Sequence, residues 1–259
     1  MKIHFYKYHG AGNDFILIDN RENEVSFLSK QNISDLCNRH FGVGADGLML
    51  LNNHKEYDFE MDYYNSDGSG STMCGNGGRC IVAFAKKLKL FNNSVKFLAS
   101  DGLHEAEIKE NGLIKLKMTN VTEFLQDADN YIVNTGSPHI VIFKDDIENI
   151  DVFNEGRKIR NSQKFKENGI NVNFVSENDG ELSIRTYERG VENETLSCGT
   201  GSVASAIAYY KKYNPNIKNI KLKTLGGELN VKFEEKQNGF ENVYLEGQAK
   251  FVFEGDYYF

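Results

Sequence analysis

Short stretches in which apolar and polar residues alternate run through most of this chain. In Asp58–Tyr64, for example, Phe59, Met61 and Tyr63 share one face. A two-residue period is typical of half-buried β-strands. The pattern predicts strands at Ile3–Tyr8, Phe15–Asp19, Leu48–Leu51, Asp58–Tyr64, Val95–Ala99, His104–Lys109 and Leu113–Met118, and then at Tyr131–Asn134, His139–Phe143, Val172–Val175, Leu182–Tyr187, Ile220–Thr224, Glu228–Phe233, Val243–Glu246 and Ala249–Phe253.

Two segments have the helical period instead, with apolar residues recurring every three or four positions. One runs from about Gly77 to Leu88 and the other from about Gly201 to Tyr213. Both are apolar over much of their surface, as expected for a helix surrounded by strands. Shorter helices are predicted near residues 32–39 and 152–160.

The order of these features repeats along the chain: strands, a strand ending in Asn, a Cys-Gly turn, a buried helix and then hairpins. Asn65 precedes Cys74 in the first series, and Asn171 precedes Cys198 in the second. Thr119–Asn130 between them is polar and has no clear period. We therefore expect two similar halves, residues 1–120 and 121–250, that face each other across a cleft with one Cys turn on each wall.

Composition excludes several classes of protein. The 259 residues are 40% hydrophobic and carry a net charge of −7, which argues against a nucleic-acid partner. The sequence has no apolar run of membrane-spanning length and no signal-peptide pattern at Met1–His9, so we expect a cytoplasmic protein without a membrane partner. Four cysteines are too few for a disulfide scaffold, and their spacing does not indicate a metal site.

Cys74 and Cys198 each stand at the start of a predicted helix, whereas Cys37 and Cys80 are interpreted as buried apolar residues. Unpaired N–H groups and the helix dipole at such a position favour a thiolate. A single Cys-Gly turn can be a plain strand-to-helix connection, but two in equivalent places suggest one thiol and one thiolate acting on one substrate. The N–H groups of Gly75, Asn76, Gly199 and Thr200 could then hold a carboxylate.

Six motifs together identify a family resemblance. They are HGAGNDF at His9–Phe15, GVGADG at Gly42–Gly47, NSDG at Asn65–Gly68, CGNG at Cys74–Gly77, ERG at Glu188–Gly190 and CGTG at Cys198–Gly201. In this order they resemble the diaminopimelate epimerase family. The resemblance implies a cofactor-independent epimerase, without metal, that interconverts LL- and meso-diaminopimelate for lysine and peptidoglycan synthesis.

The resemblance also implies a fold and roles for particular residues. The fold is an α+β type with two pseudo-symmetric halves, each a curled, mostly antiparallel sheet around a central helix, and with the C-terminal strand, residues 251–259, joining the first half. Cys74 and Cys198 would be the acid/base pair, assisted by His139 and Glu188. The implied substrate-binding residues are Asn13, Asn65, Gly75, Asn76, Ser137, Asn171, Glu188, Arg189, Gly199 and Thr200.

Four features depart from the family pattern, and two alternative functions stay open. Gly47 stands where some relatives carry Gln, and Val191–Leu196 is one residue longer than in many relatives. Ser137 stands where many relatives have Asn, and Phe253 replaces a Tyr associated with dimer packing in one branch, although a homodimer is still considered. One alternative is another two-cysteine racemase of the proline racemase type. The other is a non-catalytic ligand-binding protein in which the two thiols form a redox switch.

Overall fold

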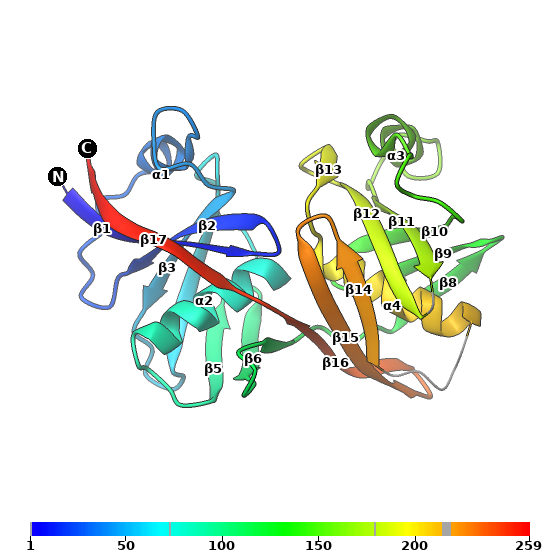
Figure 1. Ribbon diagram of the computed structural model, residues 1–259. Helices are drawn as coiled ribbons and strands as arrows, with labels where there is room; N and C mark the ends of the chain where they lie inside the picture. Colours follow the sequence, from blue (N-terminus) through cyan, green and yellow to red (C-terminus); the bar gives the residue numbers. More distant parts are fainter. Residues whose placement is uncertain (1, 73, 179, 214–218) are drawn as a thin grey trace. The chain divides into compact units, whose positions relative to one another are not determined.

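The computed structural model describes residues 2–72, 74–178, 180–213 and 219–259. The chain divides into two compact units, Met1–Leu116 with Gln248–Phe259, and Lys117–Gly247. Each unit contains strands and helices, as Figure 1 shows. The predicted α+β class with two pseudo-symmetric halves is confirmed by the order of elements within each unit.

Unit 1 is a curled, mixed sheet that packs around one central helix. Its elements are β1 (Lys2–Gly10), β2 (Asn13–Asp19), α1 (Lys30–Cys37), β3 (Gly47–Asn52), β4 (Phe59–Asn65), α2 (Gly75–Lys87), β5 (Ser94–Ala99), β6 (Gly102–Ile108), β7 (Ile114–Lys117) and β17 (Lys250–Tyr258). Neighbouring strands follow the order β17-β1-β2-β3-β4-β5-β6-β7. The β2–β3 and β4–β5 pairs are parallel and the others antiparallel.

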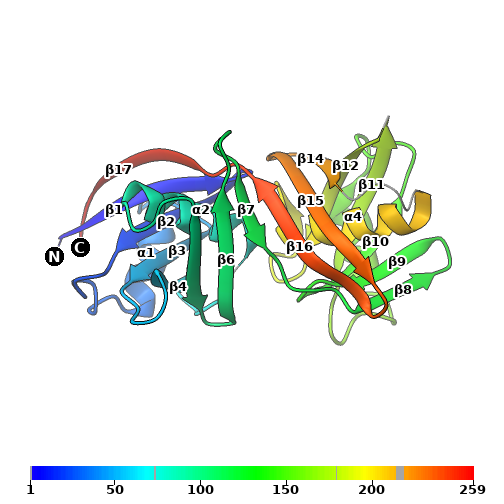
Figure 2. The ribbon, with the colours of Figure 1, turned by 90° about the horizontal axis from the view of Figure 1, so that it is seen from below.

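Unit 2 repeats this arrangement. Its elements are β8 (Glu123–Asp127), β9 (Asn130–Asn134), β10 (Pro138–Phe143), α3 (Val152–Arg160), β11 (Asn171–Asn178), β12 (Glu181–Glu188), β13 (Asn193–Thr195), α4 (Gly199–Tyr213), β14 (Asn219–Thr224), β15 (Gly227–Lys236) and β16 (Gly239–Gly247). The parallel pairs are β10–β11, connected through α3, and β12–β14, connected through α4. The antiparallel neighbours β14, β15 and β16 run side by side in Figure 2.

The two predicted buried helices are confirmed, and their burial explains the apolar character of their sequences. In α2, Ile81, Phe84 and Ala85 are fully buried, and the Phe84 ring contacts Tyr6 and Tyr8 of β1. In α4, the residues from Val203 to Tyr210 are all buried. Burial of this many apolar side chains outweighs the weak helix preference of the glycines in the first turns.

Two strands, β8 and the three-residue β13, lie outside the segments predicted as strands. Thr119–Asn130 contains β8, which pairs with β9 in a hairpin. Its residues Glu123, Leu125 and Gln126 are exposed, so the strand has no buried face to produce an alternating pattern. Hydrophobic periodicity does not predict strands of this kind.

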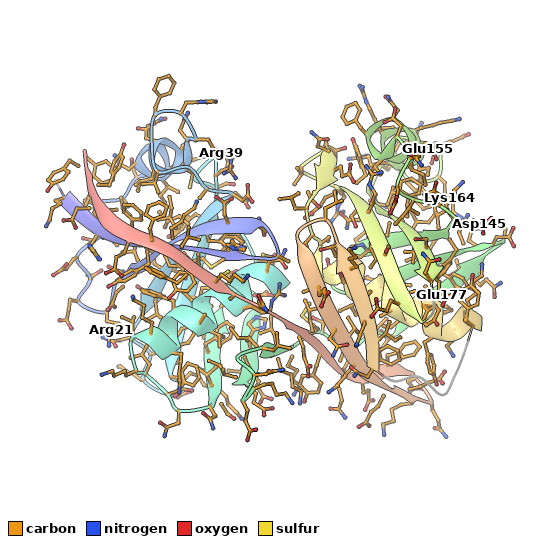
Figure 3. All side chains as sticks on the ribbon, in the orientation of Figure 1. Arg21, Arg39, Asp145, Glu155, Lys164 and Glu177 are labelled. Atoms are coloured by element: carbon orange, nitrogen blue, oxygen red, sulfur yellow. The ribbon has the colours of Figure 1, made fainter. Side chains whose placement is uncertain are left out.

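A cluster of charged side chains joins the loop after α1 to β1 and β2 in unit 1. Asp14 accepts from both terminal nitrogens of Arg39, at 3.1 and 2.7 Å, and its Oδ2 lies 2.6 Å from Nζ of Lys7. Arg39 also donates to Asp46 and is labelled in Figure 3. Burial alone would raise the pKa of Asp14, but the hydrogen bonds and charges of Arg39 and Lys7 lower it to about 2.

This depressed pKa predicts acid sensitivity of unit 1. A carboxylate with a lowered native pKa stabilises the fold above its unfolded pKa, and that stabilisation is lost as pH falls toward the native value. We expect the free energy of unfolding to fall by about 2 kcal/mol from this group between about pH 5 and pH 2. Urea unfolding of Asp14→Asn across that range should lack this component, whereas Asp145→Asn at an exposed position (Figure 3) should follow the wild type. Equal pH profiles for wild type and Asp14→Asn would contradict the assignment.

Candidate active site

Cys74 is the N-cap residue of α2. Its backbone is extended, and its Sγ accepts a hydrogen bond from the Gly77 N–H at 3.2 Å. A Cβ at Gly77 would lie 2.1 Å from Met49 Cε and 3.2 Å from this sulfur, so a side chain there would displace Met49 and crowd the thiol. The sequence therefore holds the sulfur at the positive end of the helix dipole, beside the N–H groups of Gly75 and Asn76, which have no acceptor within the helix.

Asn13 lies beside Cys74 at the start of β2. The β1–β2 hairpin turns through Ala11 and Gly12, both with positive φ, of 50° and 84°. Asn13 Nδ2 donates to Asp46 Oδ2 at 2.6 Å, and Asn13 Oδ1 lies 3.9 Å from Cys74 Sγ. Because a carboxylate only accepts, Asp46 fixes the orientation of the amide and turns its oxygen toward the thiol. Asp46 lies in the GVGADG motif, but no local pattern marks it as the partner of Asn13.

Arg79 lies within α2, and its side chain folds back onto the first turn of that helix. It has no exposed surface, and it donates to the Gly75 carbonyl at 3.0 Å and to Asn76 Oδ1 at 2.8 Å. None of the ion pairs found among the described residues involves it. Because Arg79 only donates, it fixes the amide of Asn76 with the oxygen turned inward. Arg79 was not among the predicted site residues, although a charge within an apolar helical segment is a signal that could have indicated it.

Asn65 is the last residue of β4, and it forms hydrogen bonds within the turn that follows this strand. Its backbone N–H donates to the Ser69 carbonyl at 2.8 Å, and its Nδ2 donates to Ser69 Oγ at 3.2 Å. It pairs with Gly47 of β3, where a Cβ would lie 2.6 Å from the Tyr63 ring and from the Tyr64 carbonyl oxygen. The tyrosine ring therefore occupies the space that a side chain at position 47 would need.

Cys198 immediately precedes α4, in the position equivalent to Cys74. Its Sγ lies 3.4 Å from Thr200 Oγ1, and its carbonyl accepts from both the N–H and the hydroxyl of Ser202 at 2.9 Å. Thr135 Oγ1 donates to the Thr200 carbonyl at 3.2 Å. These contacts fix the first turn of α4. Cys198 is 7% exposed, which makes it the more deeply buried of the two site cysteines.

Three of the predicted substrate-binding residues form one cluster in unit 2. Asn171 Nδ2 donates to Ser137 Oγ at 2.9 Å and to the Pro138 carbonyl at 3.0 Å, while its Oδ1 accepts from the Arg189 N–H at 2.9 Å. The Arg189 guanidinium donates to the Asn168 carbonyl at 2.8 Å. Its side chain runs over Gly169, where a Cβ would lie 2.6 Å from Arg189 Cδ. Ser137 thus has a defined partner despite departing from the family pattern.

The two residues predicted to assist catalysis differ in their surroundings. Glu188 ends β12 and accepts from Thr195 Oγ1 at 3.0 Å. His139 of β10 is completely buried, and burial together with the positive charge of Arg189 lowers its pKa to about 3. His139 is therefore neutral at physiological pH. Its ring Nδ1 lies 3.2 Å from Asn173 Nδ2, a partner that sequence reasoning missed.

The other two cysteines have no comparable setting. Burial raises the pKa of Cys37 to about 12 and also raises that of Cys80, which lies inside α2. Neither is a candidate acid or base at neutral pH. Over the described ranges, no group of three or more His, Cys, Asp or Glu side chains could hold a metal ion. None of the helices described there is both long and apolar enough to cross a membrane.

Comparisons with known proteins support the family suggested by the motifs. The sequence profile of the diaminopimelate epimerase family matches residues 5–123 and 131–252. The chain is 55% identical over 254 residues to a diaminopimelate epimerase from Flavobacterium psychrophilum, covering 96% of this chain and 98% of that protein. It is 40% identical over 271 residues to the Aquifex aeolicus protein of the same name, with 97% and 96% coverage.

Solved structures with low sequence identity show the fold alone. A Bacillus anthracis protein of the PhzF family aligns with a TM-score of 0.80 at 14% identity and full coverage of both chains. A hydroxyproline epimerase from Agrobacterium vitis aligns with a TM-score of 0.70 at 11% identity, covering 98% of this chain and 92% of that one. The proline racemase alternative is thus supported as a related fold only. The profile match and the identities over nearly the whole length show that this chain belongs to the diaminopimelate epimerase family of isomerases.

Proposed function

We propose that this chain interconverts LL- and meso-2,6-diaminopimelate by moving a proton at one α-carbon, without a cofactor. The observation that carries the proposal is the matched placement of Cys74 and Cys198, each directly before a buried helix and each with its sulfur at a helix N-terminus. Inversion requires a base on one face of the carbon and an acid on the other. The proposal assigns one thiol from each unit to these two roles.

The helix starts supply the second requirement of the reaction. Removing a proton next to a carboxylate places negative charge on that carboxylate as the carbanion forms. The N–H groups of Gly75 and Asn76, and of Gly199 and Thr200, are donors of the kind that bind such an anion. Arg79 donates to the Gly75 carbonyl and to Asn76 Oδ1, and Asn173 Oδ1 lies against Gly201. We propose that these two side chains keep the turns in place before the substrate arrives.

The distal amino-carboxylate end distinguishes diaminopimelate from smaller amino acids. We propose that Arg189 binds the distal carboxylate, because a guanidinium pairs with both oxygens of a carboxylate. Asn171 fixes the backbone of Arg189, and the Asn13 and Asn65 amides and the Glu188 carboxylate are further polar groups for the substrate. Glu188 and His139 would also tune the thiols. A compact cyclic substrate such as proline would not use these groups.

Deuterium uptake tests this function directly. The enzyme is incubated in heavy water with LL-diaminopimelate, and α-deuterium and the meso isomer are measured by mass spectrometry and chiral chromatography. We expect deuterium in the meso product, with L-lysine, which lacks the distal carboxylate, exchanging at least about 100-fold more slowly because it loses a charged contact. L-Proline should not exchange. Absence of exchange with diaminopimelate would reject the proposal, and exchange of proline instead would favour the racemase alternative.

The remaining proposals concern location and assembly. Because this reaction uses a small precursor of lysine and peptidoglycan, we propose a cytoplasmic location. We also propose that the protein forms a homodimer, and analytical ultracentrifugation of the purified protein would test this by its molecular mass.

A further inference from the structure

Three polar side chains are buried side by side on neighbouring strands of unit 2. They are His139 of β10, Asn173 of β11 and Thr186 of β12, each no more than 3% exposed. Asn173 and Thr186 are directly paired in the β11–β12 register. Buried polar groups of this kind are costly unless their hydrogen bonds are satisfied, so their donor and acceptor assignments are tightly constrained.

The orientation of the Asn173 amide follows from its partners. Its Nδ2 lies 3.1 Å from the Ile140 carbonyl oxygen, which can only accept, so this position must carry the NH₂ group. The Oδ1 accepts from Thr186 Oγ1 at 3.0 Å. The second hydrogen of the NH₂ group is then available to His139 Nδ1, 3.2 Å away.

This orientation decides the tautomer of His139. A ring nitrogen that accepts from an amide N–H carries no proton, so the single proton of the neutral ring must be on Nε2. Burial lowers the pKa of His139 to about 3, which agrees with a neutral ring. Nε2 is itself buried and has no hydrogen-bond partner among the described residues. His139 therefore presents a buried N–H donor.

The cluster lies against the turn that carries Cys198. A Cβ at Gly201 would lie 2.4 Å from Asn173 Oδ1 and 3.3 Å from Cys198 Cβ, so the amide and the cysteine flank the same glycine. With its proton on Nε2 and its Nδ1 lone pair engaged by Asn173, the ring can donate a hydrogen bond but has no nitrogen left to accept a proton.

We propose that Asn173 is a positioning residue that holds neutral His139 in the Nε2–H tautomer, so that His139 acts in this site as a hydrogen-bond donor and not as a base. The tautomer assignment is independent of the reaction. Its catalytic consequence rests on the proposed epimerase function.

The experiment is nitrogen NMR of the full-length protein labelled with ¹⁵N-histidine at neutral pH, with the His139 signals assigned by their loss in His139→Gln. Two-bond proton–nitrogen correlations distinguish the tautomers. We expect wild-type His139 to carry its proton on Nε2. A proton on Nδ1, or an even mixture, overturns the proposal whether or not diaminopimelate is the substrate.

Variants test the role of Asn173. In Asn173→Asp the carboxylate can only accept a hydrogen bond, so Nδ1 must carry the proton and donate it as N–H. The tautomer should therefore switch, and kcat should fall about 100-fold with KM within about threefold. Thr186→Val is the matched control, because it removes a buried partner of Asn173 but leaves the Ile140 carbonyl to orient the amide; it should keep the Nε2–H tautomer. An unchanged tautomer in Asn173→Asp, or an unchanged kcat despite the switch, contradicts the proposal. If Asn173→Asp does not fold, the wild-type spectrum still decides the tautomer.

Discussion

Replacing either Cys74 or Cys198 by Ser should lower the rate of epimerisation by about 1,000-fold while the protein stays folded. A hydroxyl is a far weaker acid and base than a thiol near neutral pH, and general acid–base catalysis contributes about 100- to 10,000-fold. Ser is also a good N-cap residue, so the starts of α2 and α4 should be preserved. Epimerisation is measured by chiral chromatography, and folding by circular dichroism and thermal melting.

The two variants should also differ from each other in a way that a merely structural role would not produce. Each retains one thiol, which can remove and return a proton on its own face of the α-carbon. We therefore expect slow deuterium exchange without inversion, from one isomer in Cys74→Ser and from the opposite isomer in Cys198→Ser. Identical isomer preferences would contradict a two-base mechanism.

Cys37→Ala and Cys80→Ala provide the matched controls. Both thiols are buried, and burial raises the pKa of each, so neither should take part in proton transfer. These variants should retain epimerase activity within about threefold, at a cost in stability of about 1–2 kcal/mol from lost packing. A large loss of activity in a well-folded control would show that the reactive thiols had been misassigned.

Most of the fold could be predicted from sequence because burial follows the local period. The predicted helix from about Gly77 and the observed α2 from Gly75 differ by two residues, and α4 agrees equally well. The exceptions are elements without a buried face or of minimal length. β8 is largely exposed, and β13 has three residues, so neither leaves a periodic pattern.

The site could be predicted from sequence only where the residues that form it are close together along the chain. A cysteine followed by glycines at a helix start is visible in the chain, and Cys74 does cap α2. The partners that orient the polar groups come from distant positions, such as Asp46 for Asn13 and Asn173 for His139. Which polar residues will face each other across a sheet depends on register, and no local pattern encodes that for a single sequence.

Arg79→Met should lower kcat/KM by about 100-fold and also destabilise the fold. Replacing a buried ion by an apolar side chain of similar volume is often neutral or stabilising, because the ion no longer has to be removed from water. Here the Gly75 carbonyl and Asn76 Oδ1 would lose a donor, so we expect a net destabilisation of about 1–3 kcal/mol. Urea unfolding and steady-state kinetics measure the two effects separately.

The catalytic loss has two physical sources. Without the guanidinium, the Asn76 amide can rotate, and the first turn of α2, which presents the N–H groups of Gly75 and Asn76, is held less firmly. The positive charge behind the first turn of α2, which adds to the helix dipole in favouring an anion, is also removed. Loss of one preorganised donor for a developing anion typically costs about 100- to 1,000-fold.

Arg79→Lys separates these two sources. The ammonium keeps the charge but lacks the planar fork that reaches the Gly75 carbonyl and Asn76 Oδ1 together. If the charge dominates, the Lys variant should recover most of the activity lost in Arg79→Met; if orientation of Asn76 dominates, both variants should be equally impaired. A value of kcat/KM within threefold of wild type in Arg79→Met would contradict both, and would leave the buried guanidinium a purely structural role. A purely structural role would not explain why a cation without an ion-pair partner is buried there. An apolar residue would fill the same space without the free-energy cost of removing a charge from water.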